Sequence, residues 1–443
     1  MAGFAVKFLG CKVSQADAML ARNALLTAGH VEVPEAEADL HVINTCCITS
    51  EAESKSRQST RRSLKHAERV IVTGCAVNLN ARQFGEIDPH VTALPGTADA
   101  VAQRLATEPL DGLATESLDG LVTAPADDLN AACADTDHGV LWRSAGDGVS
   151  NPTHPRTRGF VKVQDGCDCH CAYCIIPAVR GRARSRPAGA ILDEVARRVA
   201  DGQPEMVMTG ISVGDYRDPE RGLELGDLMC EVARVPGVQR VRLSSVEVIH
   251  VRDSLLRALT DEPKVCPHLH VPMQSGDDAV LRDMGRHYDR AQYLDHIARL
   301  RRSAPDVNLT TDVIVGFPTE DEAAFERTLD AVTQARISRV HVFPYSPRPG
   351  TSAEQLGDRV TPQEKKRRGQ VLRGRSEVGS RLHRSAKLGR RLEVLIDKVA
   401  DSQCSGYTAD YTRCYLPAGA GDRGELVTVT ARELHADGIR CSS

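Results

Sequence analysis

The fold of this chain is limited above all by a regular alternation of short β-rich runs and amphipathic helical stretches between residues 159 and 343. Helical stretches such as 190–200 and 290–302 separate runs that have the length and residue types of strands. Strands that alternate with helices form parallel sheets, so we expect a complete or partial parallel barrel of six βα units. The expected strands are FVKV (160–163), EMVMT (205–209), RVRL (240–243), HLHV (268–271), NLTTDVIV (308–315) and RVHVF (339–343).

Polar residues follow several of these runs, at the carboxyl ends where parallel barrels carry their sites. Thr209 and Gly210 follow the second run, Ser245 and Glu247 the third, and Gln274 the fourth. A glycine after a strand is more often a simple turn, and a polar side chain there is often a satisfied hydrogen-bond partner. These positions are therefore candidate ligand contacts.

Residues 1–104 show the same alternation on a smaller scale, which predicts a small α/β domain with a parallel sheet. Its expected strands are FAVKF (4–8), LHVI (40–43) and RVIVT (69–73). Each run is followed within three residues by a cysteine, namely Cys11, Cys46 and Cys75. Because the carboxyl ends of parallel strands share one edge of a sheet, we expect these three thiols to gather at one site.

Two further segments complete the expected organisation. LATEPLDG (105–112) is repeated at once as LATESLDG (113–120), and the composition of this region predicts an exposed connector over 105–152. The tail, with LEVLI (392–396), YTRCYL (411–416) and ELVTVTA (425–431), predicts a small antiparallel barrel. The expected parts are thus an N-terminal domain (1–104), the connector (105–152), a barrel domain (153–383) and a C-terminal barrel (384–443).

The chain contains fourteen cysteines. Met1–Val6 lacks the pattern of a secretion signal, and no apolar run approaches the roughly 20 residues of a membrane span, so we expect a cytoplasmic protein without a membrane partner. Thiols are kept reduced in that compartment, which favours metal or catalytic roles over disulfides. Six isolated cysteines are expected to be small buried side chains: Cys133, Cys230, Cys266, Cys404, Cys414 and Cys441.

The segment DGCDCHCAYC carries Cys167, Cys171 and Cys174 in a C-x3-C-x2-C pattern directly after an expected strand. Three thiolates on one loop can hold three irons of a 4Fe–4S cluster and leave the fourth iron open for the amine and carboxylate of S-adenosylmethionine (SAM). A structural zinc site needs four ligands, and His170 or Cys169 is available as the fourth. The pattern favours the cluster, with zinc as the alternative.

The chain resembles the radical-SAM methylthiotransferase family over nearly its whole length, apart from about 105–155. The C-terminal segment, including GYTADY (406–411), is similar to the TRAM domain, a small RNA-binding barrel. The segments that carry the family resemblance are GCKVSQADA (10–18), NTCCITSEAESKSRQ (44–58), TGCAVN (73–78), QDGCDCHCAYCIIPAVRGRARSRP (164–187), LSSVE (243–247), HLHVPMQSGDDAVLRDMGRHY (268–288), TDVIVGFPTE (311–320) and HVFPYSPRPGT (341–351).

The resemblance implies that Cys11, Cys46 and Cys75 bind a second 4Fe–4S cluster, which handles the sulfur to be transferred. It implies two uses of SAM, one as methyl donor and one as radical source, and a reducing protein such as a flavodoxin or ferredoxin. The expected SAM contacts are Thr209 and Gly210 at the methionyl amine, Gly316 in the adenine-supporting loop, and Ser245, Glu247 and Gln274 toward SAM or substrate. Cys47 and Cys169 depart from the family pattern, although register favours Cys46 and excludes Cys169.

Three substrates occur in such a family: N6-threonylcarbamoyladenosine in tRNA, N6-isopentenyladenosine in tRNA, and an aspartate of a ribosomal protein. Three segments are similar to the threonylcarbamoyl branch, which usually has Asn in place of Ser14: GCKVSQ, KSRQ (55–58) and QDGCDCHCAYCIIP (164–177), which contains Cys167, Cys171 and Cys174 and is called the radical loop below. The expected partner is the tRNA anticodon stem-loop. A threonylcarbamoyl group carries a carboxylate, which Lys12, Arg57 or Arg180 can receive.

The net charge of −4 does not itself indicate a nucleic-acid partner, but residues 361–391 contain eleven Lys and Arg against Glu364 and Glu377. Such a run is either a solvated helix face or a phosphate-binding surface. A non-catalytic iron–sulfur or zinc RNA-binding protein is the alternative of another class, but it leaves the polar residues at the barrel mouth unexplained.

Overall fold

The computed structural model describes residues 1–115 and 157–442. The chain forms two compact units. The first comprises Met1–Gly148, Gln164–Ser185 and Ser346–Gln355, and the second Val149–Val163, Arg186–Tyr345 and Leu356–Ser443. The loop with Cys167, Cys171 and Cys174 therefore belongs to the same compact unit as the N-terminal sheet.

The first unit is built on a five-stranded parallel sheet in the order β2-β1-β3-β4-β5, which confirms the predicted α/β architecture. Its strands are β1 (Gly3–Phe8), β2 (Val31–Glu32), β3 (Leu40–Thr45), β4 (Arg69–Gly74) and β5 (Val91–Ala93). Its helices are α1 (Lys12–Thr27), α2 (Ser50–Ser63), α3 (Cys75–Leu79), α4 (Ala81–Gly85), α5 (Ala98–Thr107) and α8 (Ile176–Arg180), and β7 (Gln164–Asp165) pairs with β8 (Arg184–Ser185) in a separate hairpin.

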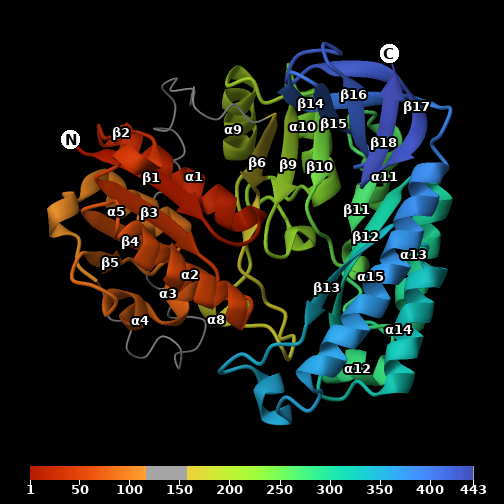
Figure 1. The fold of residues 1–443 in the computed structure, drawn as a ribbon, viewed down its shortest axis with the longest axis horizontal. Coiled ribbons are helices and arrows are strands. Elements are labelled where there is room, and N and C mark those ends of the chain that lie inside the picture. Colours follow the sequence, from red (N-terminus) through yellow and green to blue (C-terminus); the bar gives the residue numbers. More distant parts are fainter. Residues whose placement is uncertain (116–156, 443) are drawn as a thin grey trace. The chain divides into compact units, whose positions relative to one another are not determined.

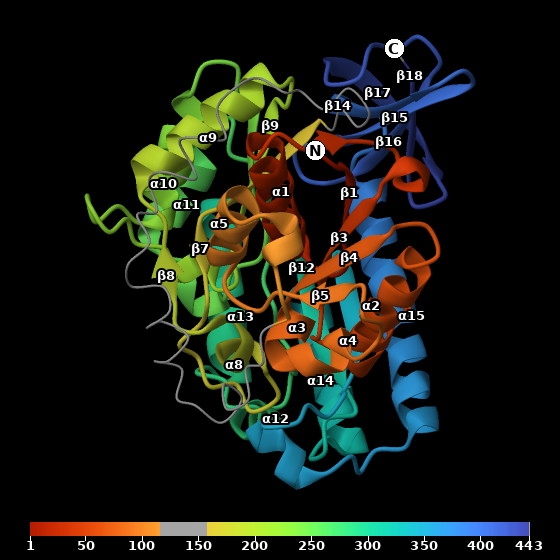
Figure 2. The same ribbon diagram turned by 90° about the vertical axis from the view of Figure 1, so that its left-hand side faces the viewer.

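The helices cover both faces of this sheet (Figure 2). Helices α1 and α5 pack on the face that carries Phe4 and Val42, in one apolar cluster. Helix α2 lies on the opposite face, where Ser63 Oγ accepts a hydrogen bond of 2.9 Å from Lys7 Nζ. Covering both faces buries the strands between two layers of helices.

The first copy of the eight-residue repeat and the first residue of the second copy extend the N-terminal core. Leu105 lies at the end of α5, and both Leu105 and Leu113 are buried in the same apolar cluster as α1. The predicted connector therefore begins with packed residues. The remainder of it, 116–156, including Cys133, lies outside the described residues.

The second unit contains two three-stranded parallel sheets, in the orders β10-β9-β6 and β11-β12-β13 (Figure 1). Their strands match the six predicted runs and confirm a partial parallel barrel: β6 (Arg158–Lys162), β9 (Glu205–Thr209), β10 (Arg240–Leu243), β11 (His268–His270), β12 (Asn308–Val315) and β13 (Arg339–Pro344). The helices between them are α9 (Ala188–Ala200), α10 (Leu225–Arg234), α11 (Asp253–Asp261), α12 (Asp278–Asp283), α13 (Arg290–Ser303) and α14 (Glu322–Gln334). No helix in the described ranges combines the length and apolar character needed to span a membrane.

Helix α15 (Pro362–Ser385) leads into a closed five-stranded barrel in the order β14-β15-β16-β18-β17. Its strands are β14 (Arg391–Ala400), β15 (Gln403–Thr408), β16 (Arg413–Pro417), β17 (Leu426–His435) and β18 (Gly438–Ser442). The pairs are antiparallel except for β16 with β18, which is parallel. Cys404, Cys414 and Cys441 lie in its apolar core, as expected for small buried side chains.

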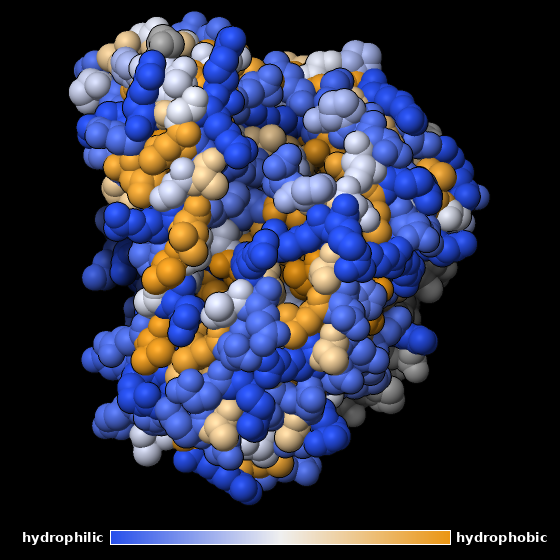
Figure 3. Space-filling model, turned by 90° about the vertical axis from the view of Figure 1, so that its right-hand side faces the viewer, coloured by the Kyte–Doolittle hydropathy of each residue, from blue (hydrophilic) through white to orange (hydrophobic). Residues whose placement is uncertain are grey.

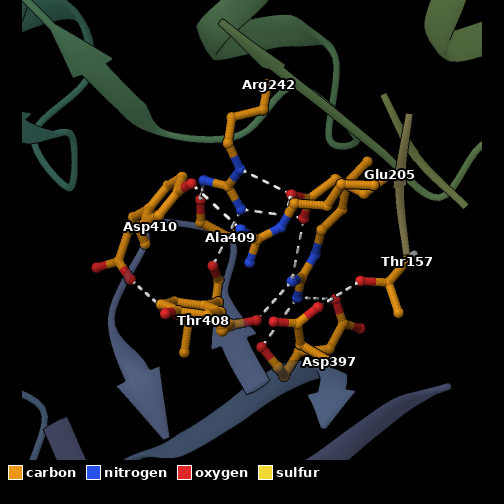
Figure 4. Close-up of polar contacts among 12 residues, drawn as sticks. Thr157, Glu205, Arg242, Asp397, Thr408, Ala409 and Asp410 are labelled. Atoms are coloured by element: carbon orange, nitrogen blue, oxygen red, sulfur yellow. Dashed lines mark hydrogen bonds and ion pairs between the residues drawn. The ribbon is translucent and has the colours of Figure 1, made fainter. Parts of the chain in front are cut away.

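A buried charge network joins this small barrel to the β6–β9–β10 sheet (Figure 4). Arg242 forms a bidentate pair with Glu205, at 3.0 and 3.1 Å, and both side chains are fully buried. Arg242 also donates to the carbonyl oxygens of Thr408 and Ala409. Arg158 adds a third contact to Glu205 at 2.9 Å. Burial would raise the pKa of Glu205, but the arginines outweigh it and hold that pKa below its usual value.

Replacing Glu205 by Gln is expected to destabilise the second unit by about 3–5 kcal/mol, because it leaves buried arginines without a compensating charge. Denaturant unfolding measures this loss. Glu393→Gln is the matched control: Glu393 lies 3.5 Å from Arg240 but is 63% exposed, so its loss should cost at most about 1 kcal/mol. Equal stability of the two variants would contradict this role for Glu205.

Candidate functional site

The three N-terminal cysteines lie at the carboxyl ends of three adjacent parallel strands. Strand β3 pairs with β1 on one side and with β4 on the other. Cys46 directly follows β3, Cys75 directly follows β4 as the first residue of α3, and Cys11 caps the start of α1 after β1. The structure therefore brings together the residues that the sequence predicted to gather at one edge.

Close packing holds Cys46 against the turn that carries Cys11. Gly10, with φ +114°, precedes Cys11, and a Cβ atom at Gly10 would lie 2.9 Å from Cys46 Cβ and 3.0 Å from Cys46 Sγ. Only glycine fits this backbone conformation and this space. Burial raises the pKa of the Cys46 thiol, and a charge on Cys11 would raise it further. The packing at Gly10 therefore keeps Cys46 next to the turn of Cys11.

Cys75 is the most enclosed of the three. Burial raises the pKa of its thiol to about 12, and charges on Cys11 and Cys46 act in the same direction, whereas the Arg180 guanidinium favours the thiolate. Cys47 is fully buried next to Cys46. Its pKa is raised by burial and then by the charges of Cys75 and Cys46. Cys47 is thus a close neighbour of the group.

The loop with the second set of cysteines is held as a tight turn between β7 and α8. Gly166 has φ +69°, and a Cβ atom there would lie 1.9 Å from the carbonyl oxygen of Arg182, so no larger residue fits. The N–H of Cys167 donates to the carbonyl oxygen of Gly181 at 3.1 Å, and that of Cys174 to Cys171 at 3.0 Å. Cys167, Cys171 and Cys174 are half-buried.

Cys169 lies beside Cys167 on this loop. The pKa of the Cys167 thiol is lowered because the thiol and the backbone N–H of Cys169 hydrogen-bond to its sulfur, the N–H at 3.4 Å. No three His, Cys, Asp or Glu side chains of the described residues converge as ligands of a single metal ion. Each cysteine set supplies three thiols, the kind of ligand that a 4Fe–4S cluster takes, one set at the strand ends and the other on the loop.

One buried arginine connects the two sets of cysteines. Arg180, the last residue of α8, donates from Nε to Cys75 Sγ at 3.1 Å. Its Nη1 donates to Asp165 at 3.0 Å and its Nη2 to Asp17 at 2.9 Å. Asp165 lies two residues before Cys167, so the network runs from the N-terminal edge to the base of the radical loop.

The predicted SAM contacts lie in the second unit, at the ends of four strands. Thr209 and Gly210 are buried after β9, and the Thr209 carbonyl oxygen accepts the N–H of Val163 at 2.9 Å. After β10, Ser245 is half-buried and Glu247 pairs with Arg286. The structure therefore gives Glu247 a strong partner of its own.

Gln274 and Gly316 occupy turns after β11 and β12. Gln274 has φ +64°, unusual for a residue other than glycine, and its backbone bonds to Asp312 and Ile314. Gly316 has φ +74°, and a Cβ atom there would lie 2.4 Å from Lys365 Cγ. Its N–H donates to Glu320 at 2.8 Å. The six predicted contact residues thus share the carboxyl rim of the partial barrel.

Comparisons with known proteins agree with these two regions. The profile of the Radical SAM superfamily matches residues 161–332, and that of the Uncharacterized protein family UPF0004 matches residues 3–96. A "Threonylcarbamoyladenosine tRNA methylthiotransferase MtaB" of Thermotoga maritima is 34% identical, over 98% of this chain and 95% of that protein. This chain belongs to the radical SAM methylthiotransferase family. It is therefore an enzyme that uses SAM and a 4Fe–4S cluster.

Other relatives of this methylthiotransferase carry two different names. The Bacillus subtilis protein, also named "Threonylcarbamoyladenosine tRNA methylthiotransferase MtaB", is 31% identical over 97% of this chain and 93% of its own length. A "tRNA-2-methylthio-N(6)-dimethylallyladenosine synthase" of Desulfitobacterium hafniense is 32% identical over 96% and 94%. The fold resembles the radical S-adenosylmethionine methyltransferase TsrM of Kitasatospora setae, with a TM-score of 0.55 at 14% identity over 77% of this chain and 72% of that one.

Sequence reasoning missed a group of polar side chains on β11 and β12 of this methylthiotransferase, namely His270, Thr310 and Asp312. His270 Nε2 lies 3.1 Å from Asp312 Oδ1, and its Nδ1 lies 2.9 Å from Thr310 Oγ1. Alternate residues Leu269 and Leu309 belong to the apolar core instead. The signal was present in HLH and TTD, where polar residues recur at every second position of neighbouring strands.

The basic run 361–391, which covers α15 and reaches the start of β14, divides into two groups. Five of its cations form ion pairs: Lys365, Arg367, Arg368, Arg384 and Lys387. The other six are exposed, with no ion pair to the residues that the structure describes: Lys366, Arg373, Arg375, Arg381, Arg390 and Arg391. The run is thus partly structural, and only the second group is available for phosphates.

The face that carries α15 is chemically mixed (Figure 3). Hydrophobic patches and a hollow interrupt its hydrophilic surface. Val378 and Leu382 of α15 are exposed and line a groove of about 380 Å³ together with Arg301, Arg336 and Arg375. This face is therefore not a uniform basic surface.

All three cations proposed for a substrate carboxylate have partners within the protein. Arg57 pairs with Glu53 at 2.7 Å, one turn earlier on α2. Arg180 is buried, and its guanidinium is occupied by Cys75, Asp165 and Asp17. Lys12, at the start of α1 beside Cys11, is half-buried.

Proposed function

We propose that this methylthiotransferase transfers a methylthio group to C2 of N6-threonylcarbamoyladenosine next to the anticodon in tRNA. The observation that carries this proposal is the pair of cysteine sets in one compact unit, one on the radical loop and one at the N-terminal sheet edge. Full-length relatives bear both tRNA substrate names, so overall identity does not choose between them. The motif Lys12–Val13–Ser14 after Cys11 favours the threonylcarbamoyl branch.

In this proposal each cysteine set holds one cluster. Cys167, Cys171 and Cys174 hold the cluster that binds SAM, and when bound this cluster supplies the electron that cleaves the sulfonium. Cys11, Cys46 and Cys75 hold the second cluster. The barrel rim binds the rest of SAM through Thr209, Gly210, Ser245, Glu247, Gln274 and Gly316. A flavodoxin or ferredoxin supplies the electrons.

The C-terminal barrel and the six exposed cations of the basic run are proposed to bind phosphates of the anticodon stem-loop. Exposed Arg and Lys side chains on a barrel of this type are suited to phosphate contacts, which position RNA without reading its sequence. A tRNA substrate would place the enzyme in the cytoplasm.

Mass spectrometry of tRNA nucleosides from a strain that lacks this gene tests the substrate. The expected result is loss of 2-methylthio-N6-threonylcarbamoyladenosine with accumulation of its unthiolated precursor. The native gene should restore the product, and a Cys171→Ala copy should not. Loss of the methylthio group from isopentenyladenosine instead, or only from a ribosomal-protein aspartate, would overturn the substrate assignment.

A further inference from the structure

Arg180 makes an unusual set of contacts for a buried arginine. Its side chain is 6% exposed, and it lies between Asp17 and Asp165, which are 3% and 7% exposed. Two carboxylates already offset its single charge. The third contact, from Nε to Cys75 Sγ at 3.1 Å, is therefore not needed for charge balance.

The two carboxylates fix the direction of that third contact. A guanidinium is planar, and its donors form a rigid fork. Asp165 accepts from Nη1 and Asp17 from Nη2, so Nε is held toward the sulfur of Cys75. Asp17 lies on α1 shortly after Cys11, and Asp165 lies on β7 just before Cys167. The arginine is thus oriented by the elements that carry both cysteine sets.

Neighbouring contacts hold this arrangement in place. Asn78 donates to the carbonyl oxygen of Val179, next to Arg180, at 2.8 Å, and its amide also bonds to Gly96 in both directions. The remaining space beside Cys75, Asp165 and Arg180 is a cavity of about 20 Å³, roughly the room one water molecule needs. A nearly dry surrounding strengthens a hydrogen bond to a charged sulfur.

We propose that Arg180 is a positioning residue that orients Cys75 in the N-terminal cluster and raises the reduction potential of that cluster through the N–H donated to Cys75 Sγ. The inference rests on the proposed role of Cys75 as a cluster ligand. Hydrogen bonds to ligand sulfurs and nearby charge are among the terms that set iron–sulfur potentials. A donor at a thiolate withdraws electron density and favours the reduced, more negative state.

The test uses the full chain with Cys167, Cys171 and Cys174 replaced by Ala, so that only the N-terminal cluster is observed. Its midpoint potential is measured by an anaerobic redox titration followed by electron paramagnetic resonance. Arg180→Gln in this background is expected to lower the equilibrium constant for one-electron reduction of the cluster at least tenfold. This corresponds to a shift of the midpoint potential by about 59 mV to more negative values. Arg180→Lys keeps a charge and a donor and should restore most of that shift.

Arg180→Gln leaves two buried carboxylates without their cation and can prevent folding. Arg180→Gln combined with Asp17→Asn removes one positive and one negative charge, so the net charge of the trio is unchanged while the donor to sulfur is lost. This double variant should show the same negative shift. Arg184→Gln is the control, because Arg184 also pairs with Asp165, at 3.3 Å, but is 31% exposed and makes no hydrogen bond to Cys75 among the described contacts. Its potential should match the parent.

The outcomes separate the two proposals. An unchanged potential in the double variant, with the cluster retained, would overturn the role of Arg180 and leave the proposed function intact. A shift of equal size in Arg184→Gln would also overturn it, because any loss of charge near the loop would then suffice. A parent protein that binds no iron would remove the second cluster itself, and with it both proposals.

Discussion

Replacement of Cys171 by Ala is expected to abolish SAM cleavage and methylthio transfer together. The loop offers three proposed ligands, Cys167, Cys171 and Cys174, beside Cys169. Because one iron must remain open for SAM, the loss of one of these three leaves the cluster without a sufficient ligand set. Anaerobically reconstituted protein should bind about eight irons, and replacement of all three loop cysteines should leave about four. Formation of 5′-deoxyadenosine, followed by chromatography after reduction with dithionite, measures cleavage.

Cys169→Ala is the internal control for this experiment. Cys169 lies on the same turn and its N–H reaches Cys167 Sγ, so the variant tests disturbance of the loop without removal of a proposed ligand. It should retain most of the activity. A Cys171→Ala protein that still forms 5′-deoxyadenosine, or an inactive Cys169→Ala protein beside it, would show that the ligand assignment on this loop is wrong.

The gathering of Cys11, Cys46 and Cys75 was predictable because it follows from local signals alone. Each cysteine comes directly after a β-rich run, and parallel pairing then places all three at one edge. The same reasoning located the six strands of the second unit and polar residues at their ends such as Thr209 and Gln274, whereas Gly316 was indicated by the family resemblance of its loop. Hydrophobic periodicity carries this information within a few residues of each element.

The short strands were not predictable in this way. Strand β2 has only two residues and β5 only three, so neither contains enough of a pattern to recognise. Strand β18 pairs in parallel with β16, although an antiparallel barrel was expected of the tail. Closure of a five-stranded barrel requires that pair, and this is a property of the whole domain rather than of either segment.

The partners of charged residues could not be predicted from the sequence either. In the sequence Arg180 was one of three candidates for a substrate carboxylate, but in the structure its partners Asp17 and Asp165 come from other elements. The basic run 361–391 likewise forms one feature in the sequence, whereas in the structure Arg368 pairs with Glu320, in the segment that follows β12. A sequence shows that a charge exists, but tertiary packing decides whether it faces solvent or another buried charge.

Replacement of Cys46 by Ala should abolish methylthio transfer and leave reductive cleavage of SAM detectable. Cys46 is one of three thiols at the N-terminal sheet edge, and the radical loop keeps its own three. The pKa of Cys46 is raised mainly by burial, opposed by the Ile48 N–H and raised further by Cys11. The close approach of Gly10 to Cys46 Sγ places this sulfur beside the turn that carries Cys11. Parallel assays of methylthiolated tRNA and 5′-deoxyadenosine separate the two steps.

Cys47→Ala decides whether the neighbouring thiol can take that role. Cys47 is fully buried. After burial, the charges that raise the pKa of its thiol are those of Cys75 and Cys46. Adjacent residues of an extended segment point in different directions. The side chain that faces the turn at Gly10 is that of Cys46, because its Sγ packs against Gly10. Cys47→Ala should therefore keep most of the transfer activity. An active Cys46→Ala protein with an inactive Cys47→Ala protein would shift the ligand by one residue, and normal transfer by both would refute a role for this strand end in sulfur delivery.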